Sequence, residues 1–190
     1  MPTFTVKPLD PSTWADFTQL VERHNGVWGG CWCMGFHDQG RRAVSAQENR
    51  EWKECRVREG RTHAALVYDG DRAVGWCQFG TPDELPRIKH RKQYAEGLAD
   101  LPDWRITCFF VDRDYRGQGV ADAALAGALT EIARLGGGIV ESYPEDVAGR
   151  KVSSSFIHNA TLSLFERHGF VRDRPLGKHH WAVRRVVDPA

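Results

Sequence analysis

The stretch FFVDRDYRGQGVA, residues 109–121, joins a buried strand to a glycine-containing turn and then to a helix. The apolar run WRITCFFV at 104–111 suits a strand that is buried on both faces. From Val120 onward, apolar residues recur at helical spacing up to the triple glycine 136–138. The first N–H groups of such a helix have no partner within it and lie at the positive end of its dipole. The stretch therefore predicts a strand–turn–helix unit that either binds phosphate or uses its glycines for turn geometry alone.

Two well-known phosphate-binding loops do not fit this turn. A dinucleotide fingerprint needs three glycines in the order Gly-x-Gly-x-x-Gly, and Asp122 stands where the third would follow Gly117 and Gly119. The Gly-Lys-Ser/Thr of a P-loop is absent from the sequence. Arg116 is available for a charge-assisted hydrogen bond to an anion. The turn thus suits an anion site of another kind.

Outward from this unit, the sequence alternates short strands and amphipathic helices. Ser45 and Glu48 form a capping box at the start of a charged helix, and Asp69-Gly70 is typical of a hairpin turn. Strands are expected near 4–6, 62–68, 73–79, 104–111, 138–143, 170–174 and 181–187, and helices near 10–24, 45–60, 93–99, 120–135 and 159–168. This order predicts a mixed α/β (α+β) fold, in which helices cover a mixed sheet.

The composition is that of an ordinary globular domain. The chain has 190 residues and a mass of 21.5 kDa, so a single domain over 1–190 is expected. Its 26 Lys and Arg against 25 Asp and Glu give a formal net charge of +1, which argues against a dedicated nucleic-acid-binding protein. PRIKHRKQ at 86–93 is a locally basic run, and it is either a solvated face or a surface that binds phosphate or a partner.

The sequence also bears on compartment and metal content. No apolar run approaches the roughly 18 residues of a membrane span, and the first residues lack the apolar core of a signal peptide. We therefore expect a cytoplasmic protein with no membrane partner and with reduced thiols at its five cysteines, 31, 33, 55, 77 and 108. Cys31-Trp32-Cys33 followed by His37 lacks the second ligand pair of a zinc site, so no metal is expected.

The glycine turn resembles the acyl-CoA-binding signature of the GCN5-related N-acetyltransferase (GNAT) family. The family pattern Arg/Gln-x-x-Gly-x-Gly/Ala is matched by Arg116-x-x-Gly119-x-Ala121. Downstream, Asn159 and then LFERHGF at 164–170 look like the family's late Asn…Tyr-Glu-Lys-x-Gly-Phe segment. The resemblance covers about residues 60–187, and the N-terminal third only through its order of elements. It implies a mostly antiparallel sheet that splays around acyl-CoA and is flanked by helices.

The resemblance also implies which residues bind acetyl-CoA, the expected co-substrate. The backbone of Phe110 and Val111 would pair with the pantetheine arm like an added strand. A backbone N–H at the bulged end of 107–111 would polarise the thioester carbonyl, where charge develops during acyl transfer. Asn159 would reach the pantetheine or the phosphates from the last helix. The turn residues implied in holding or shaping the pyrophosphate site are Arg116, Gly117, Gln118, Gly119, Val120 and Ala121.

One departure from the family pattern affects the mechanism. Many relatives carry a tyrosine where this chain has Phe165, and phenylalanine can pack against the CoA sulfur but cannot donate a proton. The thiolate would then leave unaided or take a proton from water, with Tyr143 and Cys108 as substitute donors. The family usually works by direct attack of the amine, so no cysteine nucleophile is expected.

The attacking amine must first lose a proton, which calls for a base near the thioester. Glu141 and Tyr143 alternate along one strand and so share a face. Glu141 is the first candidate for the base, acting directly or through a water, and the alternative is that it is a solvated or ion-paired strand residue. Lesser candidates are Glu22, His24 and His158.

The aromatic segment VWGGCWCMGF at 27–36 is the expected wall of the acceptor pocket. Trp28, Trp32 and Phe36 would form a surface for an apolar or cationic acceptor group, or would pack the first helices onto the sheet. The expected function is N-acetyl transfer from acetyl-CoA to a primary amine of a small molecule or peptide. The alternative is a non-catalytic acyl-CoA sensor of the same fold. A homodimer is possible, and the sequence does not decide the oligomeric state.

Overall fold

One sheet of seven strands, in the order β1-β2-β3-β4-β5-β7-β6, organises the computed structural model, which describes residues 3–41, 45–153 and 157–190. The strands are β1 (Thr5–Pro8), β2 (His63–Asp69), β3 (Arg72–Gly80), β4 (Trp104–Val111), β5 (Gly138–Ser142), β6 (Val171–Leu176) and β7 (His180–Val187). The helices are α1 (Trp14–Arg23), α2 (Ala46–Arg58), α3 (Arg91–Glu96), α4 (Val120–Arg134) and α5 (Leu162–Arg167). β4 and β5 run parallel, and the other neighbouring strands are antiparallel. The predicted fold class is confirmed.

Most elements lie where the sequence predicts them, and two helices begin later. The oxygen of Ser45 accepts a hydrogen bond from the Glu48 N–H at 3.1 Å, so the predicted cap of α2 is confirmed. α1 begins at Trp14 because the Asp10 carboxylate holds the preceding residues in a turn, accepting from the Ser12 N–H at 2.7 Å. α5 begins at Leu162 instead of 159, because Ala160 has a left-handed φ of 59° that no helix accommodates.

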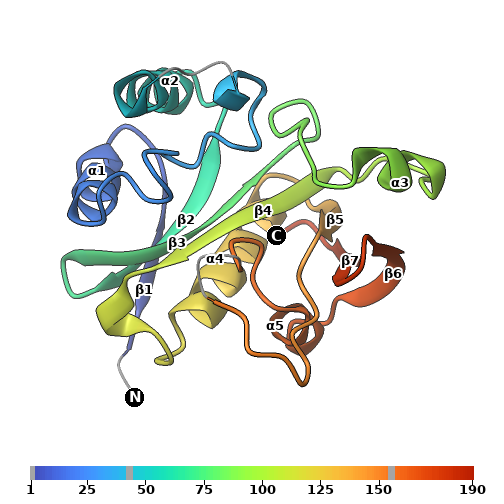
Figure 1. Cartoon of the computed structure of the whole chain (residues 1–190). Helices are drawn as coiled ribbons and strands as arrows, with labels where there is room; N and C mark the ends of the chain where they lie inside the picture. Colours follow the sequence, from blue (N-terminus) through green and yellow to red (C-terminus); the bar gives the residue numbers. More distant parts are fainter. Residues whose placement is uncertain (1–2, 42–44, 154–156) are drawn as a thin grey trace.

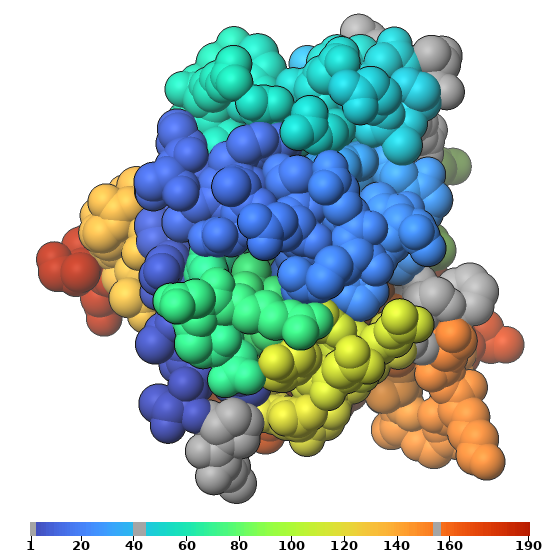
Figure 2. Space-filling view, turned by 90° about the vertical axis from the view of Figure 1, so that its left-hand side faces the viewer, coloured from blue at the N-terminus to red at the C-terminus, as the bar shows by residue number. Residues whose placement is uncertain are grey.

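Helices cover both faces of the sheet (Figure 1), and each face carries a large hydrophobic core. One core packs α4 and α5 against one face, and the other packs α1 and α2 against the second face. Figure 2 shows α1 and the chain after it between α2 and the β2–β3 hairpin, beside the segment that follows β4. No helix in the described part of the chain is long and apolar enough to cross a membrane.

β4 and β5 pair over only three residues and then separate. Their partners are Trp104 with Val140, Arg105 with Glu141 and Ile106 with Ser142. Directly after this, the register between β3 and β4 shifts, which leaves Thr107 as an extra residue in β4. The predicted splay of the sheet is thus present, and it begins at a bulge.

The bulge exchanges the faces to which β4 sends its side chains. Before it, Ile106 lies in the core under α4. After it, Cys108 lies in the core under α1 and α2, while Phe109 lies on the α4 side. Phe110 then stacks on the buried Trp76 with ring centroids 4.8 Å apart. The second half of β4 therefore presents one aromatic residue to each side of the opening.

We expect the α4 core to be sensitive to truncation. Leu125 is completely buried, so Leu125→Ala should lower the free energy of unfolding by about 2–5 kcal/mol through lost contacts and a cavity. Leu101 is 59% exposed, and Leu101→Ala should change it by no more than about 0.5 kcal/mol. Urea denaturation of the two variants beside the wild type measures both values. Equal losses in the two variants would contradict this packing.

Candidate functional site

A cavity of about 580 Å³ opens where β4 ends and α4 begins; we call it the α4 cavity. The end of β4, the glycine turn, the first turn of α4, the residues after α1 and the segment around α5 form its walls. Its lining residues are His24, Val27, Trp28, Phe109, Phe110, Val111, Arg116, Gly117, Ala121, Asp122, Ile157, Ala160, Thr161, Leu164 and Arg167. The structure therefore brings together five of the predicted donor-binding residues, Phe110, Val111, Arg116, Gly117 and Ala121, and adds Trp28.

The N-terminus of α4 is open toward solvent. Gly119 stands at the N-cap with φ of 90°, and no side chain caps the helix. A Cβ placed on Gly117 or Gly119 would meet no heavy atom within 4 Å, so there is free space in front of the turn. The Ala123 N–H donates to the Gly119 carbonyl at 3.0 Å, and the N–H groups before it precede the helix's own bonding pattern. Together with Arg116, these donors form a site suited to an anion.

Not all turn residues face the α4 cavity. The Gln118 amide donates to the Asp114 carbonyl at 2.8 Å, and the Val120 side chain is buried in the core. Their backbone N–H groups can still contribute to the anion site, since that role needs no side chain.

Asp112 fixes the turn from behind. Its carboxylate is 1% exposed, accepts from the Asp114 N–H at 3.2 Å, and lies 3.2 Å from His24 Nε2 and 3.4 Å from Arg23 Nη2. Burial alone would raise the pKa of Asp112, but the Asp114 N–H, His24 and Arg23 lower it below its ordinary value. The anchored carboxylate ties α1 to the strand end that carries the site.

Two predicted donor-binding residues lie behind the α4 cavity wall. Asn159 is buried and faces a small neighbouring space together with Tyr143. Phe165 is completely buried and packs edge-on against Phe109 and Phe170, with centroids 5.9 and 5.0 Å apart. Phe165 thus supports the wall that Phe109 forms.

The edge of β4 inside the opening already has one hydrogen bond. The Phe109 N–H donates to the His158 carbonyl at 2.7 Å, so the chain before α5 lies beside the splayed strand. The predicted polarising N–H at the bulged end of β4 is, at Phe109, taken by this bond.

Glu141 and Tyr143 share a face, as expected, but neither residue lines the α4 cavity. Glu141 is completely buried, and its two oxygens accept from the Tyr143 hydroxyl at 2.8 Å and from Arg184 Nε at 2.7 Å. This geometry favours the ion-paired interpretation of Glu141. Burial and the nearby Glu141 carboxylate raise the pKa of Tyr143 well above its ordinary value, which makes its hydroxyl a poor proton donor.

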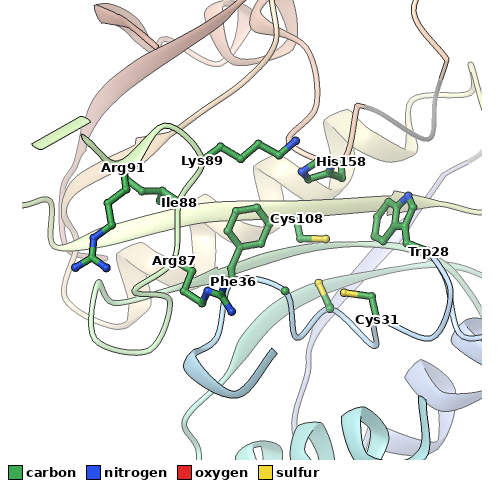
Figure 3. A pocket seen from close by; sticks show the side chains of 11 residues that line it. Trp28, Cys31, Phe36, Arg87, Ile88, Lys89, Arg91, Cys108 and His158 are labelled. Carbon is green, nitrogen blue, oxygen red and sulfur yellow. The ribbon is translucent and has the colours of Figure 1, made fainter. Parts of the chain in front are cut away.

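A second cavity of about 490 Å³, the loop cavity, lies next to the α4 cavity and shares Trp28 with it (Figure 3). Segment 27–36, the chain after β3, β4 and the residues before α5 form its walls. Its lining residues are Trp28, Cys31, Cys33, Gly35, Phe36, Arg87, Ile88, Lys89, Arg91, Cys108 and His158. Phe36 and Trp28 thus line it, as expected for an acceptor wall.

The two tryptophans of the aromatic segment have different positions. Trp28 is 37% exposed and meets Phe110 and His158 edge-on, with centroids 5.9 and 6.1 Å apart. Trp32 is buried against Trp14 and Phe17, each 6.2 Å away. Trp28 therefore fits the pocket interpretation, and Trp32 fits the packing interpretation.

A buried lysine beneath the loop cavity was not anticipated. Lys53 is completely buried, and its ammonium donates to Thr62 Oγ1 at 2.7 Å and to Gln78 Oε1 at 2.6 Å. Burial lowers the pKa of Lys53 and raises that of Cys108, one of three thiols that line the cavity. α2 is charged on every side in sequence, so no hydrophobic pattern marks Lys53 as the buried position. Among the described residues, no group of three His, Cys, Asp or Glu side chains could hold a metal ion.

The sequence matches one known protein family over most of its length. Residues 18–151 match the sequence model of a family described as the acetyltransferase (GNAT) family. The chain belongs to the GNAT acetyltransferase family. The predicted family is therefore confirmed, although the match ends before the second motif at 159–170.

Solved structures share this GNAT fold at low sequence identity. A GNAT-family acetyltransferase from Desulfovibrio desulfuricans has a TM-score of 0.54 and 15% identity, over 97% of this chain and 99% of that one. The ribosomal-protein-S18-alanine N-acetyltransferase from Escherichia coli has a TM-score of 0.52 and 12% identity, over 99% and 96%. An acetyltransferase from Salmonella typhimurium, solved with its cofactor acetyl-CoA, has a TM-score of 0.54 and 14% identity, over 98% and 95%. No curated protein sequence matches the chain.

In this GNAT chain, the titration of His158 tests whether its ring lies in the loop cavity. Burial, followed by the nearby Lys89 and His180, lowers the pKa of His158 to about 4. An unfolded histidine titrates near 6.5, so the folded chain binds fewer protons between these two values. We therefore expect the His158 contribution to stability to be complete above about pH 6.5 and to be lost as the pH falls toward 4.

Two measurements check this expectation. NMR of histidine-labelled protein, assigned with His158→Gln, should show a His158 midpoint near pH 4. Urea denaturation should show the wild type losing stability relative to His158→Gln as the pH is lowered through this window. A midpoint near 6.5 would mean that the ring is solvated and does not line the cavity as described.

Proposed function

We propose that this GNAT chain transfers the acetyl group of acetyl-CoA to a primary amine of a small molecule or peptide. The observation that carries the proposal is the open N-terminus of α4, with its two left-handed glycines and Arg116, at the end of a strand that has parted from its neighbour. A dipole end with free N–H groups suits a pyrophosphate, and the adjacent strand edge suits an amide-rich arm.

The residues of the α4 cavity suit both the phosphates and the pantetheine arm of acetyl-CoA. The N–H groups from Gly117 to Ala121 and the Arg116 side chain would hold the phosphates. Phe110 and Val111 would offer the strand edge, with Trp28 beside them, its ring centroid 5.9 Å from that of Phe110. A ligand that paired with this edge at Phe109 would have to replace the His158 carbonyl as acceptor of its N–H. Asn159 and Phe165 would act from behind this wall, by holding the segment that forms it.

The acceptor amine would enter from the loop cavity. Its nitrogen would attack the thioester carbonyl directly, forming the amide bond as the carbon–sulfur bond breaks and the electron pair leaves with sulfur. Of the bases suggested by the sequence, Glu141 would need to leave Arg184 and Tyr143 before it could accept a proton. His158 lines the loop cavity, so its ring is better placed than Glu141 to accept the amine's proton.

The first experiment separates an enzyme from an acyl-CoA sensor of the same fold. Phe165 supplies no hydroxyl to the leaving group, yet a CoA thiolate can leave without one, so we expect thiol release that depends on the added amine. Purified protein is incubated with acetyl-CoA and a panel of primary amines while free thiol is followed. Tight acetyl-CoA binding with no thiol release across the panel would support the sensor instead.

The second experiment tests the anion site at α4. Aspartate is one of the few side chains that adopt a left-handed backbone, and no heavy atom lies within 4 Å of the new Cβ, so Gly119→Asp should keep the fold with some backbone strain while placing a negative charge in front of the turn. We expect CoA affinity to fall at least about tenfold by calorimetry, which corresponds to about 1.4 kcal/mol. Gly60→Asp, at another open left-handed glycine just after α2, is the matched control and should bind CoA normally. Unchanged affinity in Gly119→Asp would remove the turn from the donor site.

A further inference from the structure

The basic run at 86–93 forms one wall of the loop cavity. Arg87, Lys89 and Arg91 line it, and none of its lining residues within the described ranges is acidic. The chain as a whole has a formal net charge of only +1, so this excess of cations is local. The run is therefore more than a solvated face, since it borders the cavity that faces the proposed acceptor.

The backbone holds this wall against the aromatic segment. The Arg87 N–H donates to the Phe36 carbonyl at 3.2 Å, which joins the chain after β3 to the residues after α1. In Figure 3, Lys89 extends toward His158 and the Arg87 guanidinium lies next to Phe36, whereas Arg91 points to the far end. Two cations thus reach the same aromatic-lined opening from either side of Ile88.

In the parts of the chain that the structure describes, neither Arg87 nor Lys89 forms an ion pair or a side-chain hydrogen bond to another residue. Glu145 is the acidic residue whose charge favours the protonated form of Lys89, and the Glu145 carboxylate is already paired with Arg150 at 3.0 Å. An anion at the mouth of the loop cavity would accept charge-assisted hydrogen bonds from these cations.

We propose that the acceptor amine also bears an anionic group, a carboxylate or a phosphate, which Arg87 and Lys89 bind at the mouth of the loop cavity. The apolar part of this acceptor would lie against Phe36 and Ile88, with its amine directed toward Trp28 and the α4 cavity. This inference rests on the proposed acetyl transfer and adds the class of acceptor. It replaces the expectation of a cationic acceptor group, because the cavity wall would repel one.

The test uses pairs of primary amines that differ only in the anionic group. Phenylalanine is compared with phenylalaninamide for the carboxylate, and phosphoethanolamine with ethanolamine for the phosphate. We expect kcat/KM, followed by thiol release from acetyl-CoA, to be about tenfold or more higher for the anionic member of at least one pair. The pair that shows the preference identifies the anion, and the preference should weaken as salt rises from 0.01 to 0.5 M.

Variants assign the preference to residues. Arg87→Gln and Lys89→Gln should each reduce the anionic-to-neutral ratio of kcat/KM about threefold, and the double variant should bring it near one. Lys92→Gln is the matched control, because Lys92 belongs to the same basic run, is exposed and does not line the cavity. It should keep the wild-type ratio.

The outcomes separate this inference from the proposed function. Turnover of amines with equal rates for both members, a preference for the neutral member, or equal loss in Lys92→Gln would overturn the anionic acceptor while leaving acetyl transfer in place. No thiol release with any amine, despite acetyl-CoA binding by calorimetry, would overturn both. Loss of acetyl-CoA binding itself in Arg87→Gln or Lys89→Gln would assign these cations to the donor instead.

Discussion

The short parallel contact between β4 and β5 is the constraint on which the rest of the site depends. Three residue pairs hold the two halves of the sheet together, and the bulge at Thr107 then turns β4 away. Because the two strands are parallel, the chain between them must cross over as a helix, and α4 starts at the end of β4 where the opening lies. A free strand edge and the positive end of a helix are therefore adjacent as a result of topology alone.

The two cavities on either side of Trp28 differ in chemistry. The α4 cavity combines backbone N–H groups with Arg116, and the loop cavity combines aromatic rings, thiols and the cations of the basic run. The walls come from segments that are far apart in sequence, such as 27–36, 87–91 and 157–161, and they meet only once the sheet has formed. The near-neutral total charge of the chain thus conceals two adjacent cavities whose walls carry more basic than acidic side chains.

The parts of this site that depend on local chemistry could be predicted from the sequence. The apolar run at 104–111 is bounded by Asp103 and Asp112, and it forms a strand over the predicted residues. Side-chain roles that depend on distant partners could not be predicted: Arg184, which pairs with Glu141, lies on another strand 43 residues later. In the same way, nothing in the aromatic segment itself shows that Trp32 turns inward and Trp28 outward. The basic run at 86–93 is visible in the sequence, but periodicity does not indicate where a connecting segment lies in the fold.

The backbone of segment 27–36, which follows α1, is strained at four residues. Val27, Trp28, Trp32 and Cys33 all have left-handed φ angles between 44° and 59°, a conformation that costs of order 1–3 kcal/mol per non-glycine residue. Whole domains are stable by only about 5–15 kcal/mol, so the strain in this segment takes up a large share of that margin. Packing of Trp32 and a hydrogen bond from Asn49 to the Gly30 carbonyl at 2.9 Å hold it in place. Glycine substitutions next to Trp28 would relieve this strain and raise stability, but they would also let the Trp28 ring move. Because Trp28 lines both cavities, such a gain in stability would change the shape of both.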